Sequence, residues 1–83
     1  MSTRTVMVNL NSIDSVKIFC EINTMKFGGI VEARSGRWVI DGKSIMGMFS
    51  LDLSKDIEVC LEADTEAEID TLVKLYSEAN FLV

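Results

Sequence analysis

The chain has 83 residues, of which 48% are hydrophobic and 25% charged, a composition typical of one small globular domain. Eight lysines and arginines against thirteen aspartates and glutamates leave a net charge of −5, which opposes binding to nucleic acids and to anionic membranes. A domain of this size has little room for a large catalytic cavity, so we expect residues 1–83 to form one domain that is not an enzyme.

The sequence contains no histidine. This absence excludes phosphohistidine, histidine-based nucleophile activation and histidine metal ligands, and we expect neither a metal nor a cofactor. The start of the chain leads directly into a strand pattern rather than a signal peptide, and no stretch is apolar enough to cross a bilayer. We therefore expect a cytoplasmic protein whose two cysteines, Cys20 and Cys60, are reduced and packed in apolar surroundings.

The first predicted elements are a strand and a helix. Apolar and polar residues alternate over Thr5–Leu10, with Val6 on the apolar face, which predicts a half-buried strand. Ser12 offers a cap for a helix from Ile13 to about Met25, where apolar residues recur at three- and four-residue steps. The pair Gly28-Gly29 ends this helix.

The middle of the chain predicts a hairpin and a short helix. Two β-rich runs, Ile30–Arg34 and Arg37–Asp41, flank Ser35-Gly36, where glycine can supply the positive φ that a tight turn needs. Ser44 then precedes Ile45–Phe49, a stretch long enough for about one and a half helical turns. Ser44 is placed to cap that helix.

The last part of the chain predicts a strand followed by a helix. Apolar residues alternate with Glu58, Cys60 and Glu62 in a strand that is apolar on one face only. Thr65 and Glu68 fit a capping box. The helix that follows has an apolar stripe made of Ile69, Leu72, Val73, Tyr76 and Ala79.

The predicted order is therefore βαββαβα, with no internal repeat and no linker. Four strands with helices on one face predict an α+β fold, an open-faced sandwich with a four-stranded antiparallel sheet. Strand alternation predicts which residues form the interior. We expect Val6, Val8, Ile57, Val59 and Leu61 of the sheet to pack against Phe19, Ile69, Leu72, Val73 and Tyr76 of the helices.

One segment resembles a known family. Within Val39–Leu53, the run Lys43-Ser44-Ile45-Met46-Gly47 followed by Ser50-Leu51 is similar to the second-helix region of HPr, the histidine-containing phosphocarrier of the bacterial sugar phosphotransferase system. In Gram-positive HPr proteins this run surrounds a regulatory phosphorylation site, so the resemblance implies that Ser44 is phosphorylated. The family's fold has the same βαββαβα order, and the lengths on either side of the run agree over nearly the whole chain.

The chain departs from the family in the loop between the first strand and the first helix. There the family carries its active-site histidine followed by alanine, arginine and proline, whereas this chain has Asn11–Val16 without histidine, arginine or proline. The resemblance therefore implies a divergent HPr-like member that does not carry phosphate on histidine and acts as a regulatory or adaptor protein. It implies protein partners, such as an HPr-type serine kinase or a transcriptional regulator.

The apolar residues after Ser44 exceed what so short a helix can bury. We expect Met48 to point into the core, while Ile45, Met46 and Phe49 form an exposed patch around Ser44. In the alternative interpretation these residues only close one end of the core. Lys43, beside the serine, is either a solvated charge or a residue that helps a kinase or partner locate the site.

Two other functions remain open. The protein could be a phosphocarrier with a different acceptor, for which Asp14 is the only candidate, although acids in a first helical turn commonly complement the helix dipole. It could also keep the fold only for self-association or for sensing a small molecule. The sequence does not predict the oligomeric state.

Overall fold

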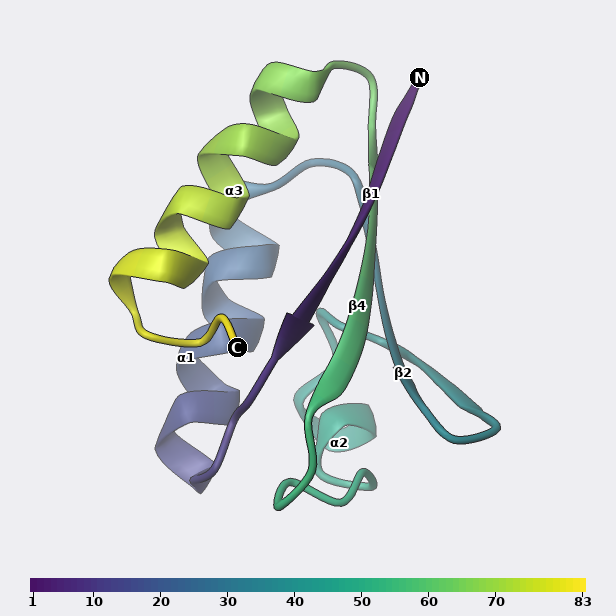
Figure 1. The fold of residues 1–83 in the computed structure, drawn as a ribbon, viewed down its shortest axis with the longest axis vertical. Helices are drawn as coiled ribbons and strands as arrows, with labels where there is room; N and C mark the ends of the chain where they lie inside the picture. The colour runs from purple at the N-terminus through teal and green to yellow at the C-terminus, as the bar shows by residue number, and fades with distance from the viewer.

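In a computed structural model that describes residues 1–83, a four-stranded antiparallel sheet is covered on one face by helices (Figure 1). The elements follow the predicted order, which confirms the α+β fold class. In chain order they are β1 (Ser2–Val8), α1 (Ile13–Lys26), β2 (Ile30–Ser35), β3 (Trp38–Asp41), α2 (Ile45–Met48), β4 (Ile57–Ala63) and α3 (Glu66–Glu78).

The strands lie in the order β1-β4-β2-β3, so the last strand of the chain is inserted between the first and the second. β4 pairs along its whole length with β1, while β3 pairs only with Glu32–Ser35 of β2. α1 and α3 lie side by side across the sheet, and α2 lies at the end of the sheet where β1 ends and β4 begins (Figure 1). None of the helices is both long enough and apolar enough to span a membrane.

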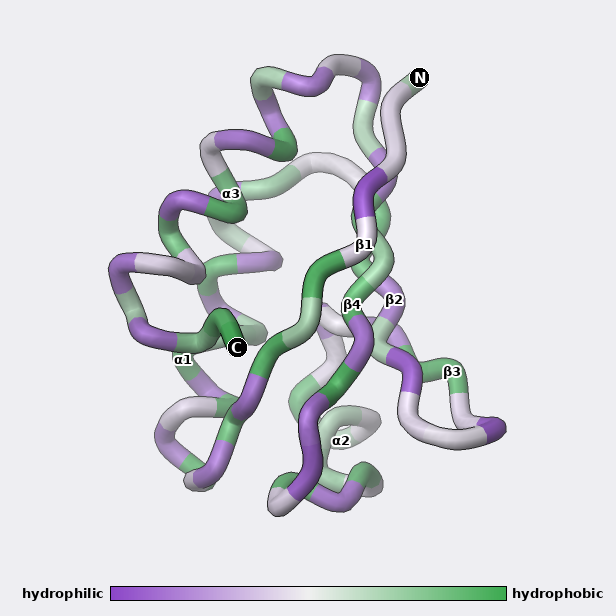
Figure 2. The backbone as a smooth tube through the Cα atoms, in the orientation of Figure 1, coloured by the Kyte–Doolittle hydropathy of each residue, from purple (hydrophilic) through white to green (hydrophobic).

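The side-chain register of the sheet is the predicted one. Ile57, Val59 and Leu61 of β4 are buried under the helices, and Glu58 and Glu62 alternate with them on the other face. Apolar and polar residues alternate along β4 and α3 (Figure 2). The predicted interior is confirmed, with Val6 and Val73 half-buried at its margin. The largest fully buried side chains include Tyr76, Phe19, Leu10, Met48, Ile57, Leu61, Ile69 and Leu72.

The boundaries of the first strand differ from the prediction. β1 begins at Ser2 rather than Thr5, because every residue from Ser2 to Val8 has a partner on β4. It ends at Val8 rather than Leu10, because the next backbone N–H, that of Asn9, bonds to the carbonyl of Phe81 at 2.8 Å. Leu10 is nevertheless buried, beyond the end of the strand.

Short polar residues begin the helices, as the sequence predicts. A glycine also turns the hairpin, but the turn is Gly36-Arg37 rather than Ser35-Gly36, because Ser35 pairs with Trp38. The Ser12 hydroxyl accepts a hydrogen bond from the N–H of Ser15 at 3.1 Å, and the Thr65 hydroxyl accepts one from the N–H of Glu68 at 3.3 Å. In the turn between β2 and β3, Gly36 has a φ of 60°, a conformation that favours glycine.

The residues after α3 form a part of the core that the sequence pattern does not predict. Asn80 adopts a φ of 61°, which turns the chain back so that the Phe81 side chain is buried against Phe19 and Tyr76. The N–H of Val83 bonds to the carbonyl of Met7 at 3.1 Å. The end of α3 is thereby fastened to the end of β1.

Candidate functional site

Ser44 is the N-cap of α2, as predicted. Its hydroxyl oxygen accepts a hydrogen bond from the N–H of Gly47 at 3.1 Å, and its carbonyl accepts the N–H of Met48 at 2.9 Å. Its own N–H donates to the carbonyl of Asp41 at 3.0 Å. Ser44 is therefore held by backbone hydrogen bonds on both sides, and its half-buried side chain caps the start of α2.

The segment before Ser44 is anchored to the core of the fold. The N–H of Gly42 donates to the carbonyl of Val31 at 2.7 Å, and the Gly42 carbonyl accepts the side-chain N–H of Asn23 at 2.8 Å. A Cβ atom on Gly42 would lie 2.4 Å from a methyl carbon of Val31, so only glycine fits without displacement. The sequence did not reveal this anchor, because its two partners lie on α1 and β2.

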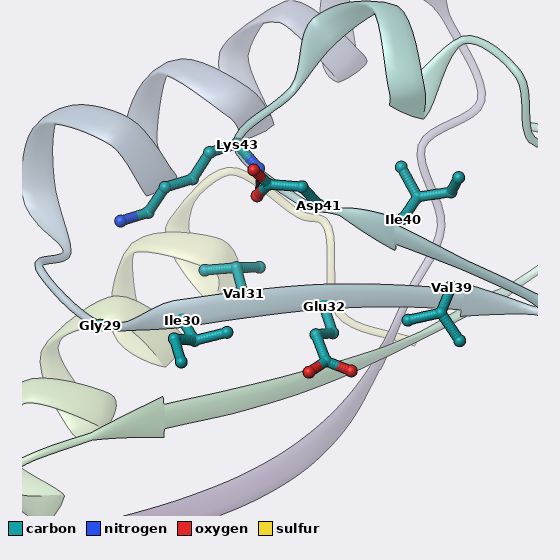
Figure 3. A pocket seen from close by; sticks show the side chains of 8 residues that line it. All are labelled: Gly29, Ile30, Val31, Glu32, Val39, Ile40, Asp41 and Lys43. Atoms are coloured by element: carbon teal, nitrogen blue, oxygen red, sulfur yellow. Dashed lines mark hydrogen bonds between the residues drawn. The ribbon is translucent and has the colours of Figure 1, made fainter.

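Lys43 has a role that neither sequence interpretation described. Its ammonium group donates to the carbonyl of Phe27 at 2.8 Å, and its N–H donates to the Asp41 carboxylate at 2.9 Å. The side chain points toward the connection between α1 and β2 (Figure 3). Lys43 therefore fastens the start of α2 to the end of α1, so its charge is not freely solvated.

The apolar residues in and just after α2 are divided between the core and an exposed patch, as the sequence analysis predicts. Met48 is fully buried and Leu51 nearly so, whereas Ile45, Met46 and Phe49 remain 42%, 82% and 38% exposed. Gly47 lies against the sheet, because a Cβ there would approach a methyl group of Ile40 at 2.7 Å. We call Ser44, Ile45, Met46 and Phe49 the α2 surface.

A hollow of about 400 Å³ adjoins the α2 surface on the side of α1. Met25, which is 71% exposed, and Ile45 contribute apolar atoms to it. Its charged side chains are Lys17 and Glu21 of α1 and Lys43, which lies before α2. The surface around Ser44 thus continues from α2 onto α1, an extension that the sequence analysis did not predict. The lining residues are Lys17, Cys20, Glu21, Thr24, Met25, Lys43 and Ile45.

The two cysteines differ in environment. Cys20 is buried in α1, as expected, and burial together with the nearby Asp41 carboxylate raises the pKa of its thiol to about 11. The expectation of burial is wrong for Cys60, which is half-buried on the face of the sheet that carries no helix. There its sulfur lies 3.6 Å from the Thr5 hydroxyl. Neither cysteine is in a disulfide.

Asp14 lies exposed in the first turn of α1. The structure brings no group of three or more cysteine, aspartate or glutamate side chains together in an arrangement that could hold a metal ion. Asp14 therefore has no Mg²⁺-binding carboxylates around it of the kind that aspartyl phosphate chemistry commonly uses.

No protein-family model matches this chain, and no curated protein matches it in sequence.

Proposed function

We propose that this protein is a regulatory or adaptor protein, HPr-like and cytoplasmic, that binds a partner protein through the α2 surface. One observation supports this most directly: a helix of four residues leaves Ile45 and Met46 exposed while Met48 alone fills the core. Adjacent exposed apolar side chains mark interaction surfaces, and methionine adapts its shape to different partners. The hollow beside Met25 gives a partner side chain a place to insert.

Ser44 is the proposed point of regulation. Its hydroxyl lies beside the exposed Ile45, so a phosphate there would add about −1.5 to −2 charges at the margin of the apolar surface. Like other charges next to an apolar interface, it would change which partners bind. The likeness of Lys43–Gly47 to the regulatory site of HPr proteins supports a serine kinase as the modifying enzyme.

Phosphorylation is tested by incubating the purified protein with ATP and an HPr-type serine kinase, followed by intact-mass measurement. We expect one added phosphate in the wild type and in Ser50→Ala, and none in Ser44→Ala. Ser50 is the matched control, because it is an exposed serine close to the end of the same helix. Phosphate that persists in Ser44→Ala would show that the site lies elsewhere.

Partner binding is tested by affinity capture from a bacterial lysate with quantitative mass spectrometry. The variant Met46→Ser/Phe49→Ser should lose the proteins that the wild type captures specifically. Ile18→Ser, which changes a side chain 47% exposed elsewhere on α1, should retain them. Both variants must still unfold cooperatively. Equal capture by wild type and the double variant would contradict the α2 surface as the binding site.

A further inference from the structure

The face of the sheet opposite the helices is uncovered, and we call it the open face. Its centre is formed by alternate residues of the two inner strands, namely Ile30, Glu32 and Arg34 of β2 with Glu58, Cys60 and Glu62 of β4. Cross-strand pairs join Ile30 to Glu62 and Arg34 to Glu58, so these side chains form one continuous surface.

Large apolar side chains are exposed on this face. Met7, Ile30 and Val39 remain 43%, 53% and 58% exposed, and they come from three different strands. Two shallow hollows lie beside them, one of about 330 Å³ next to Val39 and one of about 290 Å³ next to Cys60. Ile30 and Glu32 line both hollows. Figure 3 shows the hollow beside Val39, where these two side chains project from the same side of β2.

The charges of the open face are predominantly negative. Glu32, Glu58 and Glu62 are its carboxylates, and Arg34 is the cation among these inner-strand residues. The Arg34 guanidinium lies 3.3 Å from the Glu32 carboxylate, so that cation is already paired. Glu58 lies opposite Arg34 and is attracted to it, but neither Glu58 nor Glu62 forms an ion pair. Three carboxylates against one arginine leave this surface negative beside exposed apolar groups.

We propose that the open face binds a basic, amphipathic segment of another protein. Lysine or arginine side chains of that segment would pair with Glu58 and Glu62, while its apolar side chains would cover Ile30 and Val39. Charge complementarity selects this partner, because a second copy would bring the same carboxylates together. Nucleic acids and anionic lipids would be repelled in the same way. This site is separate from the α2 surface, since it lies on the other side of the sheet.

The experiment uses a ¹⁵N-labelled protein and a synthetic peptide of alternating lysine and leucine residues as the probe. We expect the peptide to shift the amide resonances of Ile30, Glu32 and Val39, and we expect added salt to weaken binding. A peptide with glutamate in place of lysine should cause no such shifts. If the glutamate peptide binds as well, or if the largest shifts lie on α1 and α2, the proposal is wrong.

Two charge-matched variants distinguish the open face from general attraction to an acidic protein. Glu58→Gln/Glu62→Gln should weaken peptide binding by about two- to thirtyfold, since each exposed ion pair contributes about 0.2–1 kcal/mol. Asp14→Asn/Glu78→Gln removes the same charge from exposed positions on α1 and α3 and should leave the affinity unchanged. Equal weakening by both variants would overturn the proposal. So would a dimer, detected by sedimentation of the wild type alone, that Ile30→Lys abolishes.

Discussion

The hydroxyl of Tyr76 donates a hydrogen bond to the side-chain oxygen of Asn23, which joins α3 to α1 inside the core. Both side chains are fully buried, and Asn23 is the one buried polar residue of the interior. Its amide N–H continues the connection to the Gly42 carbonyl, two residues before Ser44. A single pair of polar side chains thus links the last helix to the segment that positions the α2 surface.

Removal of the Tyr76 hydroxyl should therefore lower stability without changing the core volume appreciably. We expect Tyr76→Phe to reduce the free energy of unfolding by about 1–3 kcal/mol, because the Asn23 oxygen is left buried without a donor. Urea denaturation followed by circular dichroism measures the change. Thr71→Ala removes an exposed hydroxyl from the same helix and should change stability by no more than about 0.5 kcal/mol.

Two glycines near the ends of β2 and β3 should respond oppositely to the same substitution. Gly42→Ala would place a Cβ 2.4 Å from Val31 and should cost about 1–3 kcal/mol through overpacking. Gly28→Ala meets nothing within 4 Å and has no positive φ, so it should be neutral or stabilising by up to about 1 kcal/mol. Thermal unfolding of the two variants provides the comparison. Equal stability of the two variants would show that the backbone at Gly42 or the Val31 side chain can shift to accommodate the added methyl group at little cost.

Stability should decline in alkaline solution, partly because of Cys20. Burial raises the pKa of its thiol from 9.0 to about 11, so folding favours the protonated form. The contribution of this thiol to the free energy of unfolding is fully present below pH 9 and is lost as the pH rises toward 11. In that range the free energy of unfolding falls by at most about 1.4 kcal/mol per pH unit. Burial also raises the pKa of Tyr76, which adds to the decline.

The contribution of Cys20 is isolated by urea denaturation over this pH range under reducing conditions. Cys20→Ala should show a shallower decline than the wild type, whatever its stability at neutral pH. Val16→Ala, a truncation on the same buried helix face, keeps the thiol and should keep the slope. Parallel curves for the wild type and Cys20→Ala would exclude a contribution from this thiol.

Alkylation should distinguish the two cysteines at neutral pH. Cys60 is half-buried on the open face, whereas Cys20 is 1% exposed. Since the thiolate is the reacting species and must be accessible, we expect iodoacetamide to label Cys60 in the native protein and Cys20 only after denaturation. Peptide mapping of native and urea-treated samples identifies the labelled residue. Native labelling of Cys20 would indicate that α1 opens readily.

The parts of the fold that depend on neighbouring residues in the sequence were predictable. Ser12, Ser44 and Thr65 cap helices, and Gly36 turns the hairpin, because each acts on backbone groups within a few positions of itself. The alternation of β4 likewise determined which of its side chains face the helices. The exposed residues of α2 followed from a count of apolar side chains on a short helix.

The contacts that join distant segments could not be predicted in the same way. A pattern in one segment does not reveal that Asn23 bonds to Tyr76, or that the Lys43 ammonium bonds to the Phe27 carbonyl. Each bond depends on how whole elements are packed together. The wrong expectation for Cys60 has a different origin. It followed the general tendency of cysteine to be buried, whereas the alternation of β4 places Cys60 with the glutamates.

The position of β1 in the sheet also affects how the chain can fold. β1 pairs with β4, and the paired residues Thr5 and Cys60 are 55 residues apart in the sequence. The end of β1 also pairs with Leu82. During synthesis β1 therefore has no strand to pair with until β4 has emerged, while β2 and β3 can form their hairpin at once. Closure of so long a loop makes β1 docking a late, slow step. Until then, the apolar residues of β1 stay exposed on the growing chain.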